Sequence, residues 1–86
     1  MIGMAWIAAA ALAGVEVNTA NQAELEAVRG VGVAMSTLIL EERGKAAFKD
    51  WADFAGRVPG VGGRNAARLS AAGLTVNGAA LATAAK

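Results

Sequence analysis

Two short glycine turns are the residues of this chain that are best suited to bind a ligand. Residues 28–32 read Val-Arg-Gly-Val-Gly, and residues 58–62 read Val-Pro-Gly-Val-Gly; we call them the first and the second turn. Each turn lies between two stretches with the pattern of helices. A glycine that precedes a helix lets an anion approach the free N–H groups of its first turn, where the helix dipole is positive. Both turns are therefore candidate phosphate-binding sites.

The predicted phosphate-binding residues are those of the two turns and of the helix starts that follow them. They are Gly30, Val31, Gly32, Val33, Ala34, Gly60, Val61, Gly62, Gly63, Arg64 and Arg68. The valine between each pair of glycines should point inward and keep its turn rigid, while the other residues supply backbone donors. Arg64 and Arg68 add positive charge at the second turn only. The first turn is followed by uncharged residues, so the second turn is expected to bind more strongly.

Other glycine motifs that bind phosphate do not fit this sequence. A dinucleotide-binding fingerprint would require glycine where Met35 and Asn65 stand, and it would require a preceding strand. A P-loop would require Ser or Thr after Gly44-Lys45, where the chain has Ala46. A single Gly-x-Gly is most simply a tight connection between helices. Two copies in register, each after a valine and before a helix, favour a binding function.

The inventory of side chains argues against an enzyme. The chain has no cysteine, histidine or tyrosine, which removes the thiolate nucleophile, the usual general base and the commonest metal ligand. Its seven carboxylates are not paired in a spacing typical of a catalytic dyad. We therefore expect neither catalysis nor a bound metal or cofactor.

Positive charge is unevenly distributed along the 86 residues. All seven acidic residues lie in residues 1–56, together with four basic ones. Residues 57–86 carry no acid and four basic residues, Arg57, Arg64, Arg68 and Lys86, which gives that part a net charge of +4. This excess lies around the second turn and is the asymmetry expected where a protein meets an anion, although a solvated basic face would look the same.

The elements that must position the turns are predicted to be four helices. Asn21 with Glu24, and Asp50 with Asp53, have the pattern of N-caps with a second acidic or amide group three residues away. The predicted helices cover residues 22–28, 33 or 34 to 43, 50–57 and 63–71, with Gly44 and Gly73 as stops. The predicted core residues are Leu25, Val28, Met35, Ser36, Ile39, Leu40, Phe48, Trp51, Phe54, Ala66, Leu69, Leu74 and Val76.

A shift of thirty residues superposes the two turns without a gap, which predicts an all-α unit of four helices with pseudo-twofold symmetry over residues 15–76. Residues 1–14 are uncharged, too short to span a membrane, and end in Ala11-Leu12-Ala13. They are read as a signal peptide without a basic start, or else as a helix that packs on a protein. The Ala-rich tail 77–86 is expected to be frayed or weakly helical.

These residues resemble a known family, the tandem helix-hairpin-helix domain of the ComEA type. The resemblance covers residues 15–76 and rests on the Val-Asn-Thr-Ala lead-in at 17–20, on Phe-Lys-Asp-Trp at 48–51 and on both turns. It implies a SAM-like arrangement of two helix-hairpin-helix motifs that bind the backbone phosphates of double-stranded DNA. It also implies an exported, periplasmic protein of DNA uptake, with uptake-machinery proteins or a second copy as partners; a cytoplasmic location is the alternative.

Two other hypotheses remain beside DNA binding. The chain could be a protein-interaction or structural module that keeps the fold but binds little or no DNA, which Met35, the acidic first half and the apolar residues 1–14 favour. A fragment of a repair glycosylase ranks last, because it would need a catalytic carboxylate and a base pocket.

Overall fold

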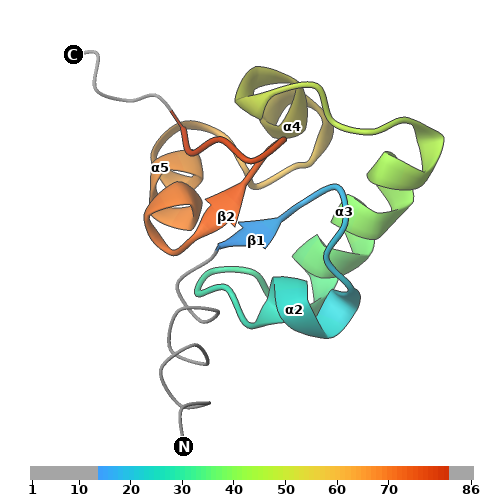
Figure 1. The fold of residues 1–86 in the computed structure, drawn as a ribbon, viewed down its shortest axis with the longest axis horizontal. Helices are drawn as coiled ribbons and strands as arrows, with labels where there is room; N and C mark the ends of the chain where they lie inside the picture. The colour runs from blue at the N-terminus through green and yellow to red at the C-terminus, as the bar shows by residue number, and fades with distance from the viewer. Residues whose placement is uncertain (1–13, 82–86) are drawn as a thin grey trace, which may run out of the picture.

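Four helices and two short strands make up residues 14–81, the part of the chain that the computed structural model describes (Figure 1). The elements in chain order are β1 (Val15–Glu16), α2 (Gln22–Glu26), α3 (Val33–Lys45), α4 (Trp51–Arg57), α5 (Gly63–Ala71) and β2 (Leu74–Thr75). None of the helices in this part is long and apolar enough to span a bilayer. The predictions for the signal-like residues 1–13 and for residues 82–86 lie outside the described range.

Polar side chains cap the first helix of each pair, as predicted. The Asn21 side chain accepts a hydrogen bond from the Glu24 amide at 2.8 Å, and the Glu24 carboxylate accepts one from the Asn21 amide at 2.8 Å. Asp50 accepts from the Asp53 amide at 2.8 Å, but Asp53 accepts from the amide of Lys49 instead of that of Asp50. These contacts satisfy N–H groups that the helix itself leaves free, which fixes where α2 and α4 begin.

The end of α3 differs from the prediction. The helix continues through Gly44 to Lys45, and Ala46 in an extended conformation is its C-cap. A glycine stops a helix only when it adopts a positive φ, and Gly44 remains helical, whereas Gly73 after α5 does adopt one, at φ 111°. A salt bridge of 2.8 Å between Lys45 and Glu42 lies on the extra turn of α3.

The hydrophobic core lies between the two helix pairs and contains most of the predicted residues. Leu25, Ile39, Phe54 and Leu69 are fully buried, each from a different helix. Phe48, in the connector between α3 and α4, is also buried and meets the Phe54 ring edge-on, with 5.0 Å between centroids. Two predicted core residues of α3, Met35 and Leu40, are only partly buried.

Ser36 is the one buried polar residue among the described residues, and its hydroxyl is fully used. It donates to Glu26 at 2.8 Å and accepts from Gln22 at 3.0 Å, so it joins α2 to α3. A buried hydroxyl with partners costs little, whereas one without would be destabilising. The sequence pattern placed Ser36 in the core without indicating these partners.

A two-stranded parallel sheet corrects the prediction of an all-α chain. Val15 pairs with Leu74 and Glu16 with Thr75, which places the start of the described fold beside its end (Figure 1). The lead-in before α2 was predicted to be extended, but two residues carry no signal for a partner strand sixty positions away. The sheet is short, and the domain remains mostly helical.

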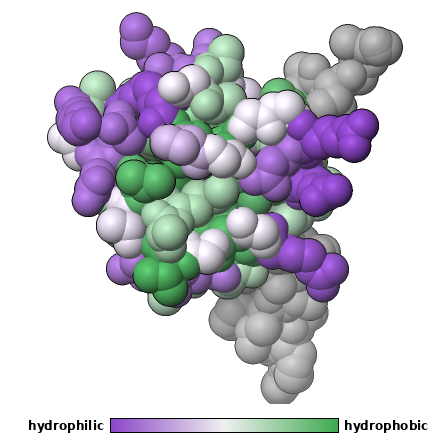
Figure 2. Space-filling model, turned by 180° about the vertical axis from the view of Figure 1, so that it is seen from behind, coloured by the Kyte–Doolittle hydropathy of each residue, from purple (hydrophilic) through white to green (hydrophobic). Residues whose placement is uncertain are grey.

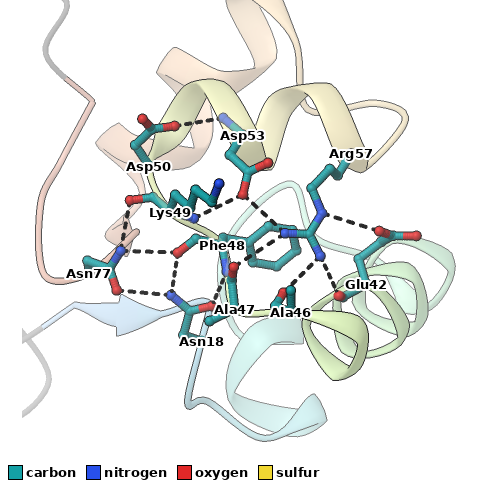
Figure 3. Close-up of polar contacts among 10 residues, drawn as sticks. All are labelled: Asn18, Glu42, Ala46, Ala47, Phe48, Lys49, Asp50, Asp53, Arg57 and Asn77. Atoms are coloured by element: carbon teal, nitrogen blue, oxygen red, sulfur yellow. Dashed lines mark hydrogen bonds and ion pairs between the residues drawn. The ribbon is translucent and has the colours of Figure 1, made fainter.

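Residues 77–81 pack on the helices without forming one, whereas a frayed or weakly helical tail was predicted from Asn77. The indole Nε1 of Trp51 donates to the carbonyl of Ala79 at 2.9 Å, and the amide of Leu81 donates to the Ser70 hydroxyl at 2.9 Å. Asn77 adopts a left-handed conformation with φ 55° and donates to the carbonyls of Phe48 and Lys49, as Figure 3 shows. The packed unit therefore extends at least to Leu81.

Candidate phosphate-binding site

The two turns have the same backbone conformation at their first glycine. Gly30 has φ 102° and Gly60 has φ 98°, values that side chains other than glycine rarely adopt. In each turn the amide of the central valine donates to the carbonyl of the valine three residues earlier, at 3.0 Å in the first and 3.2 Å in the second. Val31 and Val61 are buried, as predicted, so each turn is fastened to the core at its middle.

The second glycine of each turn opens the start of a helix to solvent. Gly32 and Gly62 are the N-caps of α3 and α5, both with φ −96°, and neither brings a side chain to cap the helix. A Cβ atom built on either glycine would meet nothing within 4 Å. The amides of Val33, Ala34 and Met35 in α3, and of Gly63 and Arg64 in α5, have no acceptor among residues 14–81. Free donors and open space therefore coincide at both turns.

The start of α5 differs from that of α3. The amide of Ser36 donates to Gly32 over four residues at 2.9 Å, whereas the amide of Asn65 donates to Gly62 over only three, at 3.1 Å. This tighter turn places Gly63 at φ 54°, a conformation open to glycine and unfavourable for the valine at the matching position of the first turn. The side-chain amide of Asn65 also donates back to the Gly60 carbonyl, so the second turn is held more firmly.

The two turns lie close to each other, because each contacts a helix of the other pair. A Cβ built on Gly30 would lie 3.0 Å from Cδ2 of Leu69 in α5. A Cβ built on Gly60 would lie 3.3 Å from Cε of Met35, the third residue of α3. Since Met35 follows Gly32 by three residues, one methionine side chain bridges the second turn and the helix start of the first.

Arg57 does not belong to the free positive charge near the second turn, which corrects the interpretation of the charge distribution. Its guanidinium donates to the carboxylates of Glu42 at 3.3 Å and Asp53 at 3.1 Å, and to the carbonyls of Glu42, Ala46 and Ala47 (Figure 3). Its central carbon lies 4.4 Å from the centroid of the Phe48 ring. Arg57 therefore fastens α4 to the end of α3.

The carboxylates around Arg57 respond to these contacts. Hydrogen bonds from Lys45 and then Arg57 hold the pKa of Glu42 below its ordinary value. A hydrogen bond from the Lys49 amide, followed by one from Arg57, lowers the pKa of Asp53. In both cases these effects outweigh desolvation, which acts in the opposite direction.

Arg43 is also used inside the fold, whereas Arg64 and Arg68 remain exposed on α5. The Arg43 guanidinium donates to the carbonyls of Val17 at 2.9 Å and Ala20 at 2.6 Å, which holds the lead-in against α3. Arg64 and Arg68 make no salt bridge within residues 14–81. Both cations are thus available to a ligand, but Arg68, which was predicted to serve the second turn, lies around one cavity with Arg29 and Gly30 of the first.

Arg29, which was not predicted as a site residue, lies with Arg68 around one open cavity of about 640 Å³. We call it the Arg29–Arg68 cavity; Gly30 and Asn65 also line it. The sequence carried a weak signal for it, since Arg29 directly precedes the first glycine, but only the contact between Gly30 and α5 brings the two arginines together.

Within residues 14–81, no three His, Cys, Asp or Glu side chains form a group that could hold a metal ion. Comparisons with protein-family models, with curated proteins and with solved structures gave no match to this chain. The site itself combines free backbone donors at two adjacent helix starts with three exposed arginines, Arg29, Arg64 and Arg68.

Proposed function

We propose that this chain binds the phosphate backbone of double-stranded DNA without sequence preference. The observation that carries the proposal is the pair of turns, with the same φ at their first glycines and an open N-cap glycine in each. Two adjacent groups of free amides suit two phosphates of a regular polyanion. Arg64 adds charge at the start of α5, and Arg68 lies with Arg29 around the cavity beside Gly30. Such contacts position a protein on DNA and do not read its sequence.

The proposal includes the finer architecture that the sequence predicted. The cross-contacts of Gly30 with Leu69 and of Gly60 with Met35 support a pseudo-twofold arrangement, because each turn packs on the second helix of the other pair. We assign α2 with α3 and α4 with α5 as two helix-hairpin-helix motifs of the ComEA type. A role in DNA uptake, with export and with uptake proteins as partners, rests on the sequence resemblance and on residues 1–14.

Salt dependence tests the proposal directly. With about four phosphates neutralised, log K for a duplex should fall with log salt at a slope of roughly −3 to −4, and two duplexes of unrelated sequence should behave alike. Fluorescence anisotropy of labelled duplexes measures both quantities. A slope near zero, or strong preference for one sequence, would contradict phosphate binding.

Gly62→Ala provides a test of the site itself. Its φ of −96° suits alanine and its Cβ would meet nothing, so the fold should tolerate the methyl group. The methyl would occupy the space through which a phosphate reaches the free amides, and we expect roughly tenfold weaker duplex binding. Gly44→Ala is the matched control, because it adds the same methyl in open space within α3, away from both turns. Equal binding by both variants would refute the assigned site.

A protein-interaction module is the second candidate, and Val33 favours it. Val33 is 67% exposed, and it is the only large hydrophobic residue of the described chain that is so exposed. It stands directly after Gly32, where a cation would suit DNA better. Figure 2 shows apolar and weakly polar residues across one face of the molecule, with strongly hydrophilic residues mostly around its edge. Failure to bind duplex DNA at low salt, with defined oligomers in sedimentation that Val33→Ser abolishes, would favour this function.

A further inference from the structure

The Arg29–Arg68 cavity has the composition of a site for an anion with an apolar body. Its apolar lining includes Ala27, Ala71 and Ala72, and its polar side chains come from Arg29, Arg68 and Asn65. No acidic residue lines it. Its volume of about 640 Å³ falls in the usual range for small-ligand pockets, which are mostly apolar with a few polar groups.

The cavity is specific to one half of the molecule. A shift of thirty residues takes Arg29 to Pro59, Asn65 to Met35 and Arg68 to Leu38, so neither cation of the cavity recurs in the other half. Ala27 corresponds to Arg57, a cation that is already bound to Glu42 and Asp53. The Met35 side chain lies against Gly60 there, whereas Asn65 folds back onto the Gly60 carbonyl. The cavity therefore comes from particular side chains and not from the repeated fold.

The same shift takes two alanines of the cavity lining to acidic residues. Ala71 and Ala72 correspond to Glu41 and Glu42, and Glu42 is occupied by Lys45 and Arg57. Acidic side chains at these positions would repel an anion, whereas alanines leave room and carry no charge. Small residues and cations thus occur together in the half that has the cavity.

Both arginines are free to bind a ligand. Arg29 and Arg68 are exposed, and neither guanidinium has a hydrogen-bond or salt-bridge partner in residues 14–81. Guanidinium groups bind phosphate through paired N–H donors and stack on planar rings. Asn65 donates its NH₂ group to Gly60, so its Oδ1 atom remains as an acceptor.

We propose that the Arg29–Arg68 cavity binds a nucleoside 5′-monophosphate group, either a free nucleotide or the phosphorylated end of a single DNA strand. Arg29 and Arg68 hold the phosphate, the base lies on the alanines of the lining, and Asn65 accepts from the base edge. Phosphate alone would leave this apolar lining unused, and a nucleoside alone would leave both cations unpaired. The proposal goes beyond duplex binding, which uses the free amides at Gly32 and Gly62.

A titration of the ¹⁵N-labelled full chain with thymidine 5′-monophosphate tests the proposal by NMR. Chemical-shift changes should be confined to the amides around the cavity, including those of Ala27, Gly30 and Ala72. Thymidine and inorganic phosphate should each bind at least about tenfold more weakly, because each lacks one half of the recognised chemistry. Equal binding of all three, or shifts centred elsewhere, would overturn the proposal.

Ala71→Glu and Ala71→Gln form a matched pair of variants. Both place a side chain of the same size at an exposed position on the cavity wall, but only Ala71→Glu adds the negative charge that the other half carries. We expect Ala71→Glu to weaken nucleotide binding roughly tenfold and Ala71→Gln to weaken it much less. Melting temperatures check that both variants fold. An equal effect of the two would contradict an anionic ligand.

Parallel measurements distinguish the cavity from the proposed duplex-binding site. They also distinguish the two sources of the ligand. Nucleotide binding without binding of a blunt, unphosphorylated duplex would support the cavity and refute the duplex proposal; the reverse result would refute the cavity alone. A 5′-phosphorylated single strand with the same shift pattern as the free nucleotide supports a strand end as the source. Binding of the free nucleotide alone supports a small-molecule ligand.

Discussion

Arg57 and Arg64 lie seven positions apart on either side of the second turn, but they serve different purposes. Arg57 makes five hydrogen bonds to α3, α4 and their connector, and it covers the Phe48 ring. Arg64 is exposed at the start of α5. Sequence reasoning counted both as free charge, because residue type alone does not show whether carbonyls and carboxylates surround a side chain.

Arg57→Ala should therefore destabilise the fold, by about 2–3 kcal/mol in the free energy of unfolding, because carbonyls and carboxylates lose a charged donor. Arg64→Ala should leave stability within about 0.5 kcal/mol of the wild type. Urea unfolding followed by Trp fluorescence measures both. Equal stability of the two variants would show that the Arg57 contacts contribute little.

Duplex binding should depend on the exposed arginines. Arg64→Ala combined with Arg68→Ala removes the two exposed cations of α5, and we expect it to weaken binding more than Arg29→Ala, with a salt slope smaller by about 2. Anisotropy titrations at several salt concentrations give affinity and slope together. A larger loss for Arg29→Ala would move the main phosphate contact to the first turn.

The helices and turns were the most predictable elements, and the reasons are local. The N-caps at Asn21 and Asp50, the start of α5 at Gly63 and the buried valines of the turns all depend on neighbouring residues. Gly44 misled the prediction of α3, because a glycine permits a helix stop without requiring one. The Arg29–Arg68 cavity could not be predicted, since it depends on how one helix pair packs on the other.

Glycines of the turns and of α3 should respond differently to alanine. Gly30→Ala and Gly60→Ala place a Cβ at φ near 100°, and each Cβ would also crowd a neighbour, so we expect losses of about 1–2 kcal/mol. Gly44→Ala lies in a helix with open space around it and should stabilise by about 0.5–1 kcal/mol. Thermal unfolding by circular dichroism compares the three; a stabilising Gly60→Ala would contradict the turn conformation.

At the scale of the whole molecule, Glu16 joins the beginning of the fold to its end. Its carboxylate accepts from the amides of Gly78 at 2.7 Å and Asn77 at 2.8 Å and from the Thr75 hydroxyl at 2.9 Å. Partial burial raises the pKa of Glu16, but these hydrogen bonds and one from the Asn18 amide outweigh it and leave the pKa below its ordinary value of 4.5. Contacts across some sixty residues of sequence leave no local pattern, so neither they nor the sheet could be predicted.

The lowered pKa of Glu16 gives a pH dependence of definite sign. The ionised carboxylate is favoured in the folded state, so its contribution to stability is complete above pH 4.5 and is lost as the pH falls through the lower folded value. Glu16→Gln should be less stable than the wild type at pH 7, and the difference should shrink as the solution becomes more acidic than pH 4.5. Urea unfolding at several pH values measures this difference; a constant difference would show that the charge is not involved.

The parallel pairing of β1 with β2 also has a mechanical consequence. Force applied before Val15 and after the segment that follows Thr75 would pull the two strands in opposite directions along their length. Their hydrogen bonds, including the 2.8 Å bond from the Val15 amide to the Gly73 carbonyl and the 3.0 Å bond from Val17 to Thr75, would then be loaded in shear and would have to break together. A pull from beyond Leu81 would first load the bonds that hold residues 77–81 to Trp51 and Ser70, and the paired strands would resist next as the smallest element of the fold.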